Sequence, residues 1–145
     1  MNKNLINMLV RNKRLRPKKA DKKQIKSLIE AASDNVEVVR KILLNEKSAT
    51  VIFRELYESI RQLGEANWLI EGYEPLDHDI TLEILKDIKI KNNVKLNFLG
   101  RFKKIRHDAN YRGYKVPMAQ TEEIIDFWDA VGKEIIENLM KEVVS

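Results

Sequence analysis

Residues 48–72, SATVIFRELYESIRQLGEANWLIEG, decide the fold. Their apolar residues recur every three or four positions, which is the spacing of one buried face of an α-helix. Ser48 is a suitable N-cap, Gly72 is a suitable residue to end the helix, and Pro75 prevents it from continuing. We therefore expect a long helix whose buried face consists of Ile52, Phe53, Leu56, Ile60, Leu63 and Ile70.

A second amphipathic helix is expected upstream. Asp21 and Gln24 have the spacing of a capping box. A continuous apolar stripe follows over residues 25–43, so this helix is expected to end near residues 45–47. The preceding residues 1–19 form a basic arm, either disordered or a short docking helix, and residues 20–145 form the main domain.

Three more helices are expected downstream. Asp77 can cap a helix that carries apolar residues over 80–88, and residues 98–109 carry another apolar stripe, weakened by Gly100. Thr121 can cap the last helix. No alternating strand pattern is present, and the connections are short. The sequence therefore predicts an all-α fold, an antiparallel up-and-down bundle of four to five helices.

Composition narrows the class of protein. Of the 145 residues, 34% are charged and 43% are hydrophobic, which is typical of one domain with a real core. The absence of cysteine excludes disulfides and thiolate sites, and two histidines cannot build a multi-histidine metal site. No apolar run reaches the roughly 20 residues of a membrane span. We expect a soluble, cytoplasmic protein without membrane attachment, metal or cofactor.

Charge is segregated along the chain. Residues 1–26 hold ten basic residues and one acid, and residues 86–115 hold ten basic residues and two acids. The remaining chain has 7 basic and 19 acidic residues. Two basic segments on an acidic framework favour binding of a polyanion, nucleic acid first. The alternative is that both are ordinary solvated faces.

The candidate site is the segment 100–115, GRFKKIRHDANYRGYK. Histidine suits proton transfer near neutral pH, arginine holds phosphate through a planar fork, and tyrosine can stack on a base. We take Arg106, His107 and Tyr111 as candidate catalytic residues for metal-free RNA cleavage. Candidate nucleotide- or RNA-binding residues are Arg101, Lys103, Lys104, Asn110, Arg112 and Lys115. His78 is interpreted as a local capping or surface residue.

Two stretches of this sequence resemble the HEPN (higher eukaryotes and prokaryotes nucleotide-binding) family. They are residues 55–78, ELYESIRQLGEANWLIEGYEPLDH, and residues 106–111, RHDANY. The resemblance implies a helical bundle that forms a homodimer with its polar motif facing a cleft between subunits. Many members are metal-independent ribonucleases, often toxins, and others act with a minimal nucleotidyltransferase partner.

The sequence departs from that family's catalytic pattern. The family places a histidine four to six residues after its arginine, and Tyr111 stands where the histidine after Arg106 is expected. A second register, from Arg101 to His107, puts Phe102 where a polar residue belongs. Tyrosine keeps its proton at neutral pH and is a poorer proton shuttle.

These departures favour a nucleotide- or RNA-binding protein that acts beside a nucleotidyltransferase. One alternative is an active ribonuclease that uses His107 and an arginine. The other is a helical interaction scaffold, in which His107 is an ordinary surface histidine and Arg106 forms a salt bridge to a neighbouring acidic helix.

Overall fold

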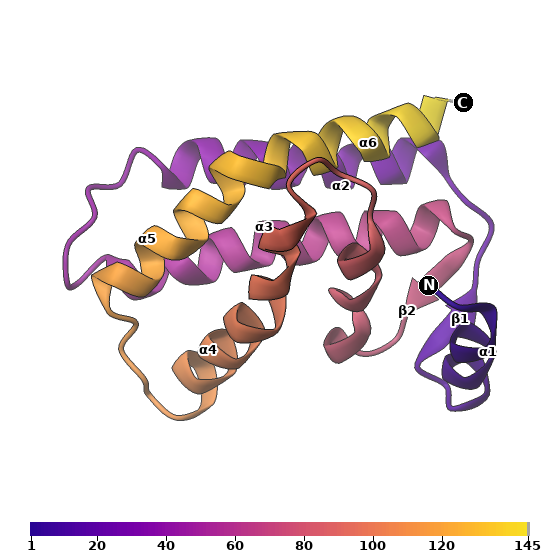
Figure 1. Ribbon diagram of the computed structural model, residues 1–145, viewed down its shortest axis with the longest axis horizontal. Coiled ribbons are helices and arrows are strands. Elements are labelled where there is room, and N and C mark those ends of the chain that lie inside the picture. The colour runs from indigo at the N-terminus through magenta and orange to yellow at the C-terminus, as the bar shows by residue number, and fades with distance from the viewer. Residues whose placement is uncertain (145) are drawn as a thin grey trace.

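The structure, a computed structural model that describes residues 1–144, is predominantly helical, and the predicted all-α class is confirmed (Figure 1). Within these residues no helix has the length and apolar character needed to cross a membrane. The α-helices are α1 (Lys3–Arg11), α2 (Lys22–Val39), α3 (Ala49–Ile70), α4 (Leu99–Tyr111), α5 (Met118–Phe127) and α6 (Lys133–Val144). Shorter elements are the strands β1 (Leu15–Pro17) and β2 (Tyr73–Pro75), the 3-10 turns η1 (His78–Ile80), η2 (Glu83–Asp87) and η3 (Asn93–Phe98), and the π turn η4 (Trp128–Gly132).

Helix α3 is the centre of the molecule. It contacts α2, α4, α5, α6 and β2, and α2 runs alongside it in the opposite direction (Figure 1). The predicted face is buried from Ile52 to Leu63, with Ile70 half-buried at the end. Gly72 ends the helix as predicted, with a φ of 92° that favours glycine.

Two helix ends differ from the sequence prediction. Helix α2 ends at Val39, so Ile42 and Leu43 lie exposed in the connection to α3 instead of on the buried stripe. The segment predicted as the last helix is divided into α5, η4 and α6, and α5 begins after Pro117, so Thr121 is not its N-cap. The Thr121 hydroxyl instead donates a hydrogen bond of 2.8 Å to the buried carbonyl of Ala49, which satisfies it inside the core.

The third predicted helix is wrong, because its residues form the turns η1 and η2 instead. The Asp77 cap itself is present, and its carboxylate accepts from the backbone N–H groups of Asp79 and Ile80. Ile80, Thr81 and Leu82 are consecutive and all buried against the rest of the chain. Tight turns let this segment lie directly against α3.

The basic arm carries a strand that the sequence pattern did not indicate. β1 pairs antiparallel with β2, so that Leu15 lies opposite Pro75. Leu15 is 1% exposed and joins the core together with Leu9 of α1. Three residues are too few for an alternating pattern to be recognised, so only the tertiary pairing reveals this strand.

Candidate anion-binding pocket

A pocket of about 270 Å³ lies where α3, η1 and α4 meet. It brings together four of the predicted site residues, one of which is His107, and also contains His78, the other histidine of the chain. Its lining residues are Tyr57, Arg61, His78, Asp79, Gly100, Lys103, Lys104, Arg106 and His107.

The period of α4 explains why this helix supplies most of the cations. Gly100, Lys103, Lys104 and His107 are spaced by three or four residues and therefore share a face, which Arg106 flanks. The opposite face is apolar and buried. Its residue Phe102 packs edge-on against Phe53 of α3, with ring centroids 6.0 Å apart. Burial of that face turns the polar face toward the pocket.

Helix α3 supplies Tyr57 and Arg61, one turn apart. Tyr57 is only 4% exposed, and the Arg106 guanidinium lies over its ring, 5.7 Å from the centroid. Burial raises the pKa of Tyr57 to about 12, although Arg106 and Arg61 act in the opposite direction. The Tyr57 hydroxyl therefore keeps its proton at neutral pH, where it is a donor and not a base.

Two of the pocket cations already have acidic partners. Arg61 donates hydrogen bonds to Glu58 at 2.6 and 2.9 Å and to Glu65 at 3.4 Å. The hydrogen bonds to Glu58 raise the pKa of Arg61. Lys103 donates to the backbone carbonyl of Asp79 at 2.7 Å and lies 3.7 Å from that residue's carboxylate. Their charges are largely matched within the protein.

Lys104 and Arg106 are the cations that remain. Within residues 1–144, neither has a carboxylate at ion-pair distance. If the protein were only a helical interaction scaffold, Arg106 would be expected to form a salt bridge to a neighbouring helix. That salt bridge is absent from the described residues. An unmatched ammonium and guanidinium beside two histidines form a site for an anion with several oxygens, such as phosphate.

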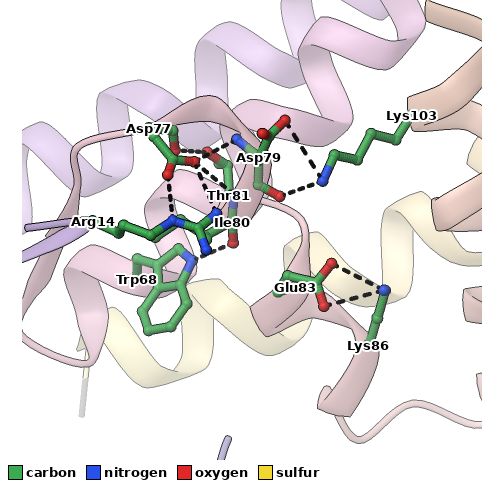
Figure 2. Close-up of polar contacts among 9 residues, drawn as sticks. All are labelled: Arg14, Trp68, Asp77, Asp79, Ile80, Thr81, Glu83, Lys86 and Lys103. Carbon is green, nitrogen blue, oxygen red and sulfur yellow. Dashed lines mark hydrogen bonds and ion pairs between the residues drawn. The ribbon is translucent and has the colours of Figure 1, made fainter. Parts of the chain in front are cut away.

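The turn η1 holds His78 at the pocket by contacts on both sides. Figure 2 shows Arg14 of the basic arm against Asp77, and Lys103 of α4 against Asp79. The hydrogen bond from Arg14 lowers the pKa of Asp77. His78 lies between these two clamped residues, so its place at the pocket depends on both basic segments of the chain.

The other predicted residues do not line the pocket. Arg101 pairs with Glu123 at 3.0 Å, and Arg112 lies 3.7 Å from Asp108. Asn110 and Lys115 are exposed. Tyr111 is 70% exposed, and its ring centroid lies 5.0 Å from that of His107, outside the hollow.

Sequence reasoning missed Tyr57, Arg61, His78 and Asp79 as site residues. Tyr57, Arg61 and His78 lie within residues 55–78, the stretch used for the family resemblance, where Tyr57 and Arg61 stand one helical turn apart; Asp79 follows directly after it. His78 is exposed, as its interpretation as a surface residue predicts, but it also lines the pocket.

No family model matches this chain, and no curated protein or solved structure shows significant similarity to it. Within residues 1–144, no group of three His, Cys, Asp or Glu side chains is arranged to hold a metal ion. The pocket combines two imidazoles with two cations that have no acidic partner in the described chain, an arrangement whose chemistry suits a phosphate group.

Proposed function

We propose that this chain is a HEPN-like helical protein that binds nucleotide or RNA through this pocket. The observation that carries the proposal is the convergence of unmatched Lys104 and Arg106 with His78 and His107 in one hollow. Arg106 and Lys104 hold the phosphate, and the protonated Tyr57 hydroxyl is an additional donor. A hollow of about 270 Å³ suits one nucleotide unit and not a duplex.

The proposed partners come from the family resemblance. We propose a homodimer that acts beside a minimal nucleotidyltransferase in the cytoplasm. The resemblance of residues 55–78 and 106–111 supports these partners, and the contacts of the pocket support the ligand.

Binding of a short single-stranded RNA at increasing salt tests the proposed function. Two phosphate contacts, by Lys104 and Arg106, predict that log K falls with log salt concentration with a slope of about −1.4. Fluorescence anisotropy between low and physiological salt measures this slope. An affinity that does not change with salt contradicts phosphate contacts.

A second candidate function is metal-independent RNA cleavage, and the presence of both histidines in one pocket favours it. One imidazole would take the proton of a 2′-hydroxyl as its oxygen attacks phosphorus. The other would protonate the departing 5′-oxygen, leaving a cyclic phosphate and a free hydroxyl. Arg106 would stabilise the extra charge on phosphorus.

Cleavage of single-stranded RNA in EDTA tests this candidate. We expect His78→Ala and His107→Ala each to lower the rate at least about 100-fold, the usual contribution of a general acid or base. Tyr111→Phe is the control, because Tyr111 lies outside the hollow, and it should keep the rate. A wild-type protein that binds RNA but leaves it intact rules cleavage out.

A further inference from the structure

The two arginines of the pocket are held in different ways. Arg61 donates hydrogen bonds to Glu58 and Glu65, so its N–H groups are directed at carboxylates of its own helix. Arg106 is half-buried, yet within the described part of the chain it has no ion-pair or hydrogen-bond partner. Its guanidinium carbon lies 5.7 Å from the centroid of the Tyr57 ring, which is within the range of a cation–π interaction.

Helix packing fixes the ring over which Arg106 lies. On α3, Tyr57 follows Phe53 by four residues, and on α4, Arg106 follows Phe102 by the same spacing. Residues at this spacing lie on the same side of a helix. The ring contact of the two phenylalanines is therefore followed, one turn further along both helices, by the contact of tyrosine with arginine. Because Tyr57 is buried, its ring cannot swing away into solvent.

A ring can hold an arginine without using its hydrogen bonds. A carboxylate accepts from the guanidinium N–H groups, as Glu58 does from Arg61, and those groups are then lost to a ligand. An aromatic face attracts the positive charge and leaves the N–H groups of Arg106 for an anion. An arginine that is already held in place also loses less rotamer freedom when the anion binds.

We propose that Tyr57 is the positioning residue for Arg106. The buried ring holds the guanidinium at the pocket, and the N–H groups stay available to a phosphate group. This inference rests on the proposed function, because it explains how the same pocket prepares its cation. It gives Tyr57 a role that belongs to the ring and is separate from the hydrogen bond that the hydroxyl can donate.

Two substitutions separate the ring from the hydroxyl, with the affinity for uridine 5′-monophosphate at low salt as the measurement. Tyr57→Phe keeps the ring, so we expect a loss of at most about threefold, the effect of one neutral hydrogen bond. Tyr57→Leu also removes the ring, and its affinity should be about tenfold lower than that of Tyr57→Phe. Equal affinities of the two variants would overturn the positioning role.

Two further backgrounds identify the group through which the ring acts. In an Arg106→Gln protein, Tyr57→Leu and Tyr57→Phe should bind the nucleotide equally, because the guanidinium that the ring holds is gone. In a Lys104→Gln protein, the tenfold difference should persist, since within the described residues Lys104 has no contact with this ring. A difference that persists without Arg106 would show that the ring acts by packing alone, and would overturn the proposal.

The contact itself is tested by NMR in the protein without ligand. Protons over the face of an aromatic ring resonate upfield, so the side-chain protons of Arg106 should lie upfield in wild type and in Tyr57→Phe. They should return toward ordinary shifts in Tyr57→Leu, whose fold is checked by circular dichroism. Ordinary Arg106 shifts in wild type would overturn the proposal whatever the stability of the variants.

The matched control is Tyr73→Leu. Tyr73 is also half-buried or better and packs edge-on against Trp68, but it does not line the pocket. Its replacement should leave nucleotide binding as in wild type, and a loss equal to that of Tyr57→Leu would overturn the specific role of Tyr57. Wild type that binds the nucleotide without any dependence on the Tyr57 ring overturns this inference alone. Wild type that does not bind it overturns the proposed function, and the inference with it.

Discussion

Replacing Gly64 with alanine is expected to lower the free energy of unfolding by about 3 kcal/mol, because the new methyl group overpacks a backbone contact. Gly64 lies on the buried side of α3, where the chain after η1 crosses it. A Cβ at this position would lie 3.1 Å from the carbonyl carbon of Thr81 and closer still to its oxygen. The new methyl group would meet the backbone of Thr81, so no flexible side chain could move aside to relieve the contact.

Gly100→Ala is the matched control. Gly100 lies in the first turn of α4, and a Cβ there meets nothing within 4 Å. The same substitution should leave stability unchanged or raise it by up to about 1 kcal/mol, since alanine favours helix. Urea unfolding of both variants measures the difference. A Gly64→Ala protein as stable as wild type would contradict the close crossing that brings η1 to the pocket.

Neutralising the two unmatched cations should remove most of the RNA affinity. In Lys104→Gln/Arg106→Gln, both charge-assisted contacts to phosphate are lost, at roughly 1.5–3 kcal/mol each, so hexauridylate binding should weaken about 100-fold or more. Both side chains lie at the polar face of α4 and not in its apolar face, so the fold should persist. Anisotropy gives the affinity, and circular dichroism checks the helix content.

The control for this variant is Arg112→Gln/Lys115→Gln, which removes an equal charge just beyond the end of the same helix. Arg112 lies by Asp108 and Lys115 is exposed, and neither lines the pocket. This protein should bind within about threefold of wild type, because only its long-range field has changed. Equal losses in the two variants would mean that net charge, and not the pocket, attracts RNA.

The fold was predictable where one strong periodic signal lies on a single face. The stripe of α3 from Ile52 to Leu63 and the stripe of α4 at Phe102, Ile105 and Ala109 are buried as expected. The 3-10 turns and the β1–β2 pairing were not predictable. They depend on contacts between segments distant in sequence, as at Leu15 and Pro75, which override local pattern.

Of the residues that line the pocket, only those on α4 could be predicted from the sequence. Helical spacing within residues 100–115 puts Lys103, Lys104 and His107 on a common face, but it cannot say what faces them. His78 reaches the pocket because Asp77 and Asp79 are clamped from both sides, a tertiary arrangement that no local pattern contains. Tyr111 was predicted as a catalytic partner from its spacing to Arg106 in the sequence. In the structure His78, and not Tyr111, lines the hollow together with Arg106 and His107.

The most direct test of the account follows the two histidines by NMR as uridine 5′-monophosphate is added. They are the only histidines of the chain, so His78→Gln and His107→Gln assign their imidazole signals. The account predicts that both imidazoles shift together along one saturable curve, and that Lys104→Gln/Arg106→Gln abolishes the shift. Imidazole signals that stay unchanged while the nucleotide binds would place the ligand elsewhere and contradict the pocket.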